Sequence, residues 1–172
     1  MKFSRKWLNE YVDILDIDLN ELVDKLTLNS FEVESVEYEG EKLNNIVVAL
    51  IEKIEKHPNA DTLQVCQANI GNKVLQIITR ATNVFEGAYV PLALDGAVLP
   101  NGLEIKPTKM RGIDSMGMFC GAEEIGLPND GVDGIYILKG QFTPGENIAK
   151  VLGKDDYILD VTILSNTLCF WV

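Results

Sequence analysis

One alternating segment late in the chain constrains the fold more than any other feature. In residues 157–163 every second residue is apolar or aromatic, which is typical of a half-buried β-strand. A strand needs a partner, and the strand-forming segment 31–38 also lacks a neighbour close in sequence. Pairing the two segments would bring both ends of the chain into one small α+β layer. Everything between them would then be an insertion.

Two helices are expected before the first strand of this layer. Ser4 is a good N-cap, and it precedes an apolar stripe formed by Trp7, Leu8, Tyr11 and Val12. Asp18 and Glu21 have capping-box spacing, and they precede apolar residues at helical spacing, namely Leu19, Leu22, Val23 and Leu26. Apolar residues in 31–38 change sides along the strand, which predicts a bulge or a strand packed on both faces.

The middle of the chain has the pattern of a small β-barrel. Expected strands are 46–54, 62–70, 73–79, 89–94 and 135–138, with 109–120 bringing the chain back. Turn signals separate them, such as Gly71-Asn72 and Asn101-Gly102, and a short helix is expected near 122–126. Thr143 to Glu146 has the form of a capping box for a helix that ends near residue 152. The predicted fold class is α+β with an inserted all-β barrel.

Length and composition restrict the class of protein. The chain has 172 residues, which suits one domain, or one compact domain with a small companion. Cys66, Cys120 and Cys169 form no Cys-x-x-Cys pair, and His57 is the one histidine. A disulfide scaffold or a metal site is therefore not expected, and a reducing cytoplasm is the expected compartment. No apolar run reaches the roughly 18 residues of a membrane span, and the N-terminus lacks the apolar core of a signal peptide.

The net charge of −11 argues against a generic nucleic-acid binder, whose domain would usually be basic. The charge is unevenly distributed. Residues 71–112 hold five basic and three acidic residues, whereas residues 1–40 have a net charge of −6. A polyanion site, if present, should lie in 71–112. The alternative is an ordinary solvated surface.

Four strings in the middle block are more specific than a generic barrel requires. They are His57-Pro58-Asn59-Ala60-Asp61-x-Leu63-x-Val65-Cys66, Ala81-x-Asn83-Val84-x-x-Gly87, Lys109-Met110-Arg111-Gly112-Ile113-x-Ser115-x-Gly117-Met118-x-Cys120 and Ala122-Glu123-Glu124-Ile125-Gly126-Leu127. Their order and spacing resemble the tRNA-binding OB-fold domain of synthetases and their associated factors. The first twelve residues and Phe31-Glu32-Val33-Glu34 look like the start of the β subunit of bacterial phenylalanyl-tRNA synthetase. The resemblance extends to about residue 166.

The resemblance implies an OB-fold, tRNA-binding domain over residues 40–152 inside a split α+β domain of residues 1–39 with 153–172. It implies a non-catalytic module that binds tRNA and supports ATP-dependent charging of tRNA with phenylalanine. Expected partners are tRNA, the synthetase α subunit and the remaining β-subunit domains, with no membrane. ATP and magnesium belong to the parent enzyme, and no cofactor is expected on this chain. The expected RNA-binding residues are Arg80, Asn83, Lys106, Lys109, Arg111, Ser115 and Met118.

The chain departs from the family pattern at two places. Where the family usually has Val-Cys-Gly-Ala-Pro-Asn, this chain has Arg80 and Thr82 in place of the glycine and the proline before Asn83. The loop is therefore expected to be shaped differently. After Asn166 the family's Asn-Arg-Pro-Asp stretch is replaced by residues 167–172, which looks like a truncated or frameshifted end. The family's later domains are then absent from this chain.

Several residues in these strings have a structural interpretation beside the functional one. His57 is a candidate strand-end residue, with Asn59 and Asp61 hydrogen-bonding a turn. Cys120 is better explained as a buried small hydrophobe than as a nucleophile. Glu123 and Glu124 are adjacent on a short helix, so they point in different directions and do not form an acid–base pair.

Three other functions remain open at this point. The chain could be a protein-interaction or assembly module, which its acidity favours. It could be a free-standing tRNA-binding protein that dimerises through the barrel, although the flanking segments at both ends argue against that. An independent enzyme is the least favoured class, because the chain has no adenylate-forming signature.

Overall fold

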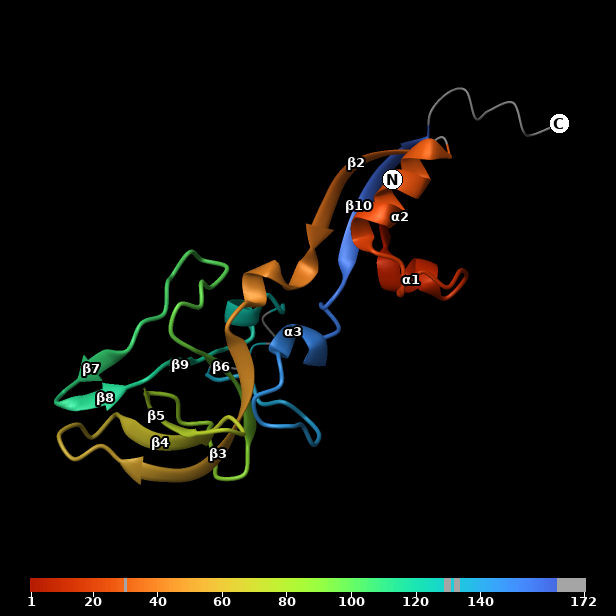
Figure 1. The fold of residues 1–172 in the computed structure, drawn as a ribbon. Helices are drawn as coiled ribbons and strands as arrows, with labels where there is room; N and C mark the ends of the chain where they lie inside the picture. Colours follow the sequence, from red (N-terminus) through yellow and green to blue (C-terminus); the bar gives the residue numbers. More distant parts are fainter. Residues whose placement is uncertain (30, 129–130, 132–133, 164–172) are drawn as a thin grey trace. The chain divides into compact units, whose positions relative to one another are not determined.

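The computed structural model describes residues 1–29, 31–128, 131 and 134–163 (Figure 1). The chain divides into two compact units, Met1–Gly40 with Gly153–Val172 and Glu41–Leu152. They are called here the terminal unit and the barrel unit. The unusual ending predicted at residues 167–172, which includes Cys169, lies outside the described residues.

The terminal unit is built on a three-stranded antiparallel sheet. Its strands are β1 (Lys2–Ser4), β10 (Tyr157–Ile163) and β2 (Phe31–Tyr38), in the order β1-β10-β2. The predicted pairing of 31–38 with 157–163 is confirmed, and its register shifts between Asp160 and Val161, which confirms a bulge. β1 was missed by sequence analysis because three residues carry no periodic signal.

The two predicted helices of this unit are α1 (Arg5–Asn9) and α2 (Leu19–Leu28). Both predicted caps are confirmed, because Ser4 accepts from the Trp7 amide and Asp18 accepts from the Asn20 and Glu21 amides. The apolar stripe predicted for α1 is wrong: the helix ends at Asn9, and the exposed large hydrophobics include Trp7, Tyr11 and Val12. The small core of this unit consists of Ile14, Leu22, Leu159 and Val161.

The barrel unit contains a nearly closed five-stranded antiparallel barrel. Its strands are β3 (Ile46–Lys56), β4 (Gln64–Asn69), β5 (Val74–Thr79), β6 (Tyr89–Ala93) and β9 (Met118–Phe119), in the order β5-β4-β3-β6-β9. The two edges approach each other next to β9, where the Met116 amide donates to the Gln76 carbonyl at 2.9 Å. Fully buried side chains from several strands fill the interior, including Ile46, Ile51, Ile77, Val90 and Leu92.

Short elements complete the barrel unit. They are η1 (Glu39–Leu43), which runs across the boundary between the units, β7 (Thr108–Met110), β8 (Ile113–Ser115), η2 (Glu123–Ile125) and α3 (Ile148–Val151). The returning segment predicted at 109–120 is thus divided among three strands. The strand predicted at 135–138 is reduced to one bridge between Tyr89 and Leu138.

The capping box predicted at Thr143–Glu146 is wrong. The N-cap of α3 is Asn147, whose side chain accepts from the Ala149 amide. Gly145 has a φ of +89°, and its amide donates to the Val48 carbonyl at 2.8 Å. This segment therefore lies against β3 in a turn, and a helix begins only after it.

Candidate functional site

Most of the predicted basic residues lie on or next to the hairpin formed by β7 and β8. Arg111 and Gly112 occupy its two-residue turn with φ values of +47° and +93°. Positive φ at both central positions is the geometry of a type I′ turn, which matches the twist of the strands it joins. A positive φ is uncommon for a residue other than glycine, so the surrounding contacts must hold Arg111 in this conformation.

The loop at residues 57–63 holds this turn, although it lies about fifty positions earlier in the sequence. His57 is buried, and its Nδ1 accepts from the Asn59 amide at 3.1 Å. The ring proton must therefore be on Nε2, which donates to the Met110 carbonyl at 3.2 Å. Asn59 donates from Nδ2 to the Arg111 carbonyl at 3.3 Å. The structural interpretation of His57 and Asn59 is supported, and the two side chains bind successive carbonyls at the hairpin turn.

The other end of the hairpin is tied to β5. Ser115 is buried, and its hydroxyl accepts from the Ile78 amide and donates to the Gly117 carbonyl, both at 3.0 Å. Gln76 donates from its side-chain amide to the Asp114 carbonyl at 2.8 Å. Ser115, which we predicted as a binding residue, has both hydrogen-bonding functions engaged inside the protein. Its place in this structure is that of a support for the hairpin.

The positive charges of the hairpin face solvent. Lys109 lies opposite Asp114 with 4.0 Å between Nζ and Oδ1, and both side chains are about two-thirds exposed. Water and salt screen a pair this exposed, so Lys109 remains available to another anion. In the part of the chain that the structure describes, the Arg111 guanidinium makes no ion pair or hydrogen bond. The guanidinium therefore does not hold the loop through the neighbouring Asp114 carboxylate.

The remaining predicted residues are more scattered. Lys106 is exposed and pairs with Glu104 at 2.9 Å, and this hydrogen bond and the charge of Glu104 raise the pKa of Lys106. Arg80 is exposed just after β5. Met118 in β9 is half-buried against the barrel core, so packing accounts for it.

A polar row crosses the outside of the barrel beside the hairpin. The strand register aligns Lys53 of β3 with Gln67 of β4, and Gln67 with Gln76 of β5. The residues on either side of Gln67 and Gln76, such as Cys66 and Ile77, are buried, so the two glutamines point outward, and Lys53 is itself exposed. No local pattern in the sequence indicates this row, because it is the strand register that brings the three residues into line.

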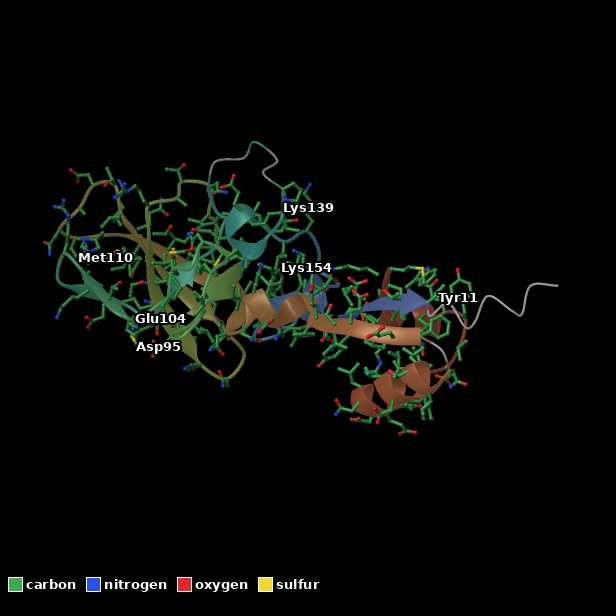
Figure 2. All side chains as sticks on the ribbon, turned by 90° about the horizontal axis from the view of Figure 1, so that it is seen from above. Tyr11, Asp95, Glu104, Met110, Lys139 and Lys154 are labelled. Atoms are coloured by element: carbon green, nitrogen blue, oxygen red, sulfur yellow. The ribbon has the colours of Figure 1, made fainter. Side chains whose placement is uncertain are left out.

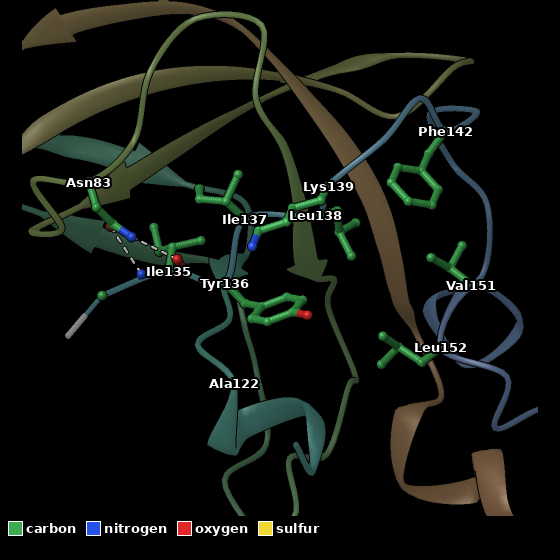
Figure 3. Close-up of a pocket in the computed structure, with 11 residues that line it drawn as sticks. Asn83, Ala122, Ile135, Tyr136, Ile137, Leu138, Lys139, Phe142, Val151 and Leu152 are labelled. Carbon is green, nitrogen blue, oxygen red and sulfur yellow. Dashed lines mark hydrogen bonds between the residues drawn. The ribbon is translucent and has the colours of Figure 1, made fainter. Parts of the chain in front are cut away.

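Asn83 lies apart from the hairpin, in the loop between β5 and β6. Its Nδ2 donates to the Ile135 carbonyl at 2.7 Å, and its Oδ1 accepts from the Ile135 amide at 3.1 Å (Figure 3). A Cβ on Gly134, at a φ of +130°, would lie 2.4 Å from Asn83 Oδ1. The amide thus fixes the segment that follows Gly134, and its polar atoms are already paired.

Replacing Asn83 by alanine should destabilise the barrel unit. Both backbone groups of Ile135 would lose their partner, and each buried group left unpaired costs about 1–3 kcal/mol. We expect a lower melting temperature for Asn83→Ala in the absence of any ligand, with Thr82→Ala as an exposed neighbouring control. An unchanged melting temperature would contradict this structural role of Asn83.

The two cysteines of the barrel unit, Cys66 and Cys120, are buried. Burial raises the pKa of the Cys66 thiol to about 11, and burial together with the charge of Glu124 raises that of Cys120 to about 12. Both thiols are therefore neutral at pH 7. Glu124 accepts from the Gly121 amide at 2.6 Å. Over the described residues there is no group of three His, Cys, Asp or Glu side chains suited to a metal ion.

None of the helices formed by the described residues is long and apolar enough to cross a membrane. Figure 2 shows side chains projecting from the ribbon of both units, among them the labelled Met110 at the end of β7. Lys109 and Arg111 of the hairpin are both exposed, so the candidate site is a surface.

Comparisons with known proteins point to one family. Residues 46–147 match the family described as "Putative tRNA binding domain". The chain is 47% identical over 167 residues to the phenylalanine–tRNA ligase beta subunit of Clostridium tetani, and 42% identical over 168 residues to that of Clostridium acetobutylicum. Each alignment covers 96% of this chain and 21% of the relative, so the chain spans about a fifth of the length of these relatives.

Among solved structures, a MetRS-related protein from Pyrococcus horikoshii is 22% identical with a TM-score of 0.43. The alignment covers 59% of this chain and 85% of that one.

Proposed function

The chain belongs to the putative tRNA-binding domain family, and on that basis we propose that it is a non-catalytic module that binds tRNA through the β7–β8 hairpin and the loop at 57–63. The observation that carries the proposal is the pair of hydrogen bonds from His57 and Asn59 to the carbonyls of Met110 and Arg111. They join two loops that are far apart in sequence into one surface, on which the Arg111 side chain is exposed.

The strand order supports assigning the barrel to the OB-fold. Numbered along the chain as first to fifth, the barrel strands lie in the order third, second, first, fourth, fifth. OB-folds are five-stranded, partly open barrels that bind nucleic acid on the face of strands two and three and on the loops joining strands one to two and four to five. Here those loops are 57–63 and the long connection that carries the hairpin. The polar row of Lys53, Gln67 and Gln76 crosses the corresponding face.

Within this proposal the domains are a tRNA-binding OB-fold of residues 40–152 and a split α+β domain of residues 1–39 with 153–172. The relatives are named phenylalanine–tRNA ligase beta subunits. We therefore propose a cytoplasmic setting in which tRNA, an α subunit and further β-subunit domains are partners, and in which ATP and magnesium serve the parent enzyme only. A weak module gains affinity in such an assembly, because neighbouring sites raise its effective concentration at the RNA.

The acidity of the chain is compatible with RNA binding. Excess negative charge is greatest in residues 1–40, whereas 71–112 has a positive balance. At physiological salt, exposed charges separated by more than about 8 Å are largely screened from one another. The cations of the hairpin can therefore act on nearby phosphates, while the net charge keeps the affinity low.

A second role in assembly is favoured by apolar side chains exposed on the terminal unit. Trp7 and Tyr11 are more than half exposed, and their rings meet edge to face at 5.3 Å. Exposed apolar clusters of this kind are typical of protein contacts. This role concerns a different unit, so it is compatible with RNA binding by the barrel.

The proposal predicts a specific response to loss of Arg111. Contacts from Lys106, Lys109 and Arg111 to phosphates should give a log–log salt slope of about −2, at roughly −0.7 per contact on single-stranded or loop RNA. The dissociation constant should lie between about 10⁻⁴ and 10⁻⁶ M, as in non-specific binding. Arg111→Ala should weaken tRNA binding and make the slope shallower by one contact, as measured by fluorescence anisotropy across a salt series.

Lys25→Ala is the matched control, because it removes one exposed positive charge from α2 of the terminal unit. It should leave the affinity and the slope unchanged. Equal effects of the two substitutions would show that the net charge of the chain alone determines the binding, which would contradict the proposed interface. A lower melting temperature of Arg111→Ala with unchanged tRNA affinity would assign Arg111 to the fold.

A further inference from the structure

A cavity of about 420 Å³ lies beside the segment that Asn83 fixes (Figure 3). Small-molecule sites usually have volumes of about 300–1,000 Å³, so the cavity is large enough to hold a ligand. All of its lining residues belong to the barrel unit. Most of them are aliphatic or aromatic, including Ile135, Tyr136, Leu138, Phe142, Val151 and Leu152.

Two polar groups of the lining are unused. Figure 3 shows the ring of Tyr136 among the lining residues, and Lys139 also lines the cavity. Over the described residues, neither the Tyr136 hydroxyl nor the Lys139 ammonium makes a hydrogen bond or an ion pair. The amide of Asn83 also lines the cavity, but both of its polar atoms are bonded to Ile135. The cavity therefore offers an aromatic ring, one hydroxyl and one positive charge.

Two backbone hydrogen bonds and one contact between aromatic rings hold the walls of the cavity in place. The Tyr136 amide donates to the Cys120 carbonyl at 3.0 Å, and the Leu138 amide donates to the Tyr89 carbonyl at 2.9 Å. Phe142 packs edge to face on Tyr89 at 5.9 Å between ring centroids. A site that is already formed avoids the free-energy cost of ordering its side chains when a ligand binds.

We propose that this cavity takes one unstacked nucleobase of single-stranded or loop RNA. The base stacks against Tyr136, and Lys139 meets an adjacent phosphate. The inference rests on the proposed function and adds a second contact point to it. The chemistry fits because aromatic rings hold bases of any sequence by stacking, while a lysine follows the backbone. A cationic ligand is disfavoured by Lys139. With one free hydroxyl for the base edge, the site should discriminate weakly among bases.

The test compares the salt dependence of binding among cavity variants, with oligoadenylate and oligouridylate 12-mers as probes. Tyr136→Ala should weaken binding of both probes roughly 5- to 100-fold, as expected for one lost stacking contact. Because stacking releases no counterions, the salt slope should not change. Tyr136→Phe keeps the ring and should bind within about twofold of the parent. Lys139→Ala should reduce the slope by about 0.7.

Two further variants guard against misfolding and non-specific effects. Val151→Phe narrows the cavity without altering Tyr136, and it should weaken binding in the same way. It replaces Tyr136→Ala as the test if that variant is unstable. Tyr11→Ala removes an exposed tyrosine from the terminal unit and should leave binding unchanged. Adenosine monophosphate as a competitor tests whether the cavity takes a base of an RNA chain or a free nucleotide. It should compete at least tenfold more weakly than the oligonucleotides, because it lacks the flanking phosphates.

The outcomes separate this inference from the proposed function. If Arg111→Ala weakens RNA binding while Tyr136→Ala and Val151→Phe do not, the cavity proposal is overturned and the hairpin interface stands. Adenosine monophosphate binding more tightly than the oligonucleotides would overturn the assignment to RNA. If the parent chain binds neither probe, both proposals fail. RNA binding that needs Tyr136 and is insensitive to Arg111 would support the cavity and contradict the hairpin interface.

Discussion

Replacing Leu159 by alanine is expected to lower the free energy of unfolding of the terminal unit by about 2–5 kcal/mol, the usual cost for a buried leucine. Leu159 is fully buried in β10, the central strand of a three-stranded sheet. Few residues share its core, so little can move in to fill the cavity that the substitution leaves. Amide hydrogen exchange should accelerate in β2 and β10 and stay unchanged in β4 and β5.

Ile163→Ala is the control for this substitution, because it removes an apolar side chain from the same strand where it is 53% exposed. It should have an effect well below that of Leu159→Ala. The tRNA affinity of both variants should equal that of the parent chain, since the proposed interface lies in the other unit. Equal acceleration of exchange throughout the barrel strands would contradict the division into two units.

Gly117→Ala is expected to destabilise the barrel unit by about 3 kcal/mol, at the upper end of the usual cost of overpacking. A Cβ at Gly117 would lie 2.5 Å from the Ala93 carbonyl oxygen, a backbone atom of β6. That oxygen cannot withdraw without disturbing the pairing of Ala93 with Met118 of β9. Because the Ser115 hydroxyl donates to the Gly117 carbonyl, the hairpin should loosen as well. Urea denaturation and tRNA titration of one variant measure both effects.

Met116→Ala, a change at an exposed neighbouring position, is the matched control. Its backbone hydrogen bond to Gln76 would remain, so stability and affinity should stay close to those of the parent chain. A Gly117→Ala variant as stable as this control would show that β9 can shift away from β6 at little cost. The barrel edge would then be too loose to position the hairpin as proposed.

Part of this fold follows from sequence because its signals are local and strong. The alternation in 157–163 and the strand formers in 31–38 predicted a pairing between distant segments, and the structure has it. Ser4 and Asp18 were recognised as caps because a cap depends on residues two or three positions away. In the barrel the strands predicted at 46–54, 62–70, 73–79 and 89–94 appear, with Gly71-Asn72 as the turn between β4 and β5, whereas the strand predicted at 135–138 is reduced to one bridge.

The errors have physical causes that sequence patterns do not contain. Thr143 to Glu146 has the residues of a capping box, but backbone pairing with Val48 holds this segment in a turn and leaves Asn147 to start the helix. Trp7 and Tyr11 have helical spacing, yet α1 ends at Asn9.

The candidate site shows the same limit. Its cations were found from local charge and motif resemblance, and their role in binding stays a prediction. The contacts of His57 with Met110 and of Asn83 with Ile135 join residues more than fifty positions apart. No pattern in one sequence reports such contacts. The register that aligns Lys53 with Gln67 and Gln76 is likewise visible only in the folded sheet.

The central claim is that the hairpin and the loop at 57–63 form one tRNA-binding surface, and amide chemical-shift mapping tests it most directly. The ¹⁵N-labelled chain is titrated with unlabelled tRNA at low and at physiological salt. The account predicts saturable shifts concentrated in residues 57–63 and 108–116, smaller at the higher salt concentration. Shifts confined to the terminal unit, or the absence of shifts at tRNA concentrations above about 10⁻⁴ M, the weak limit of non-specific binding, would contradict it.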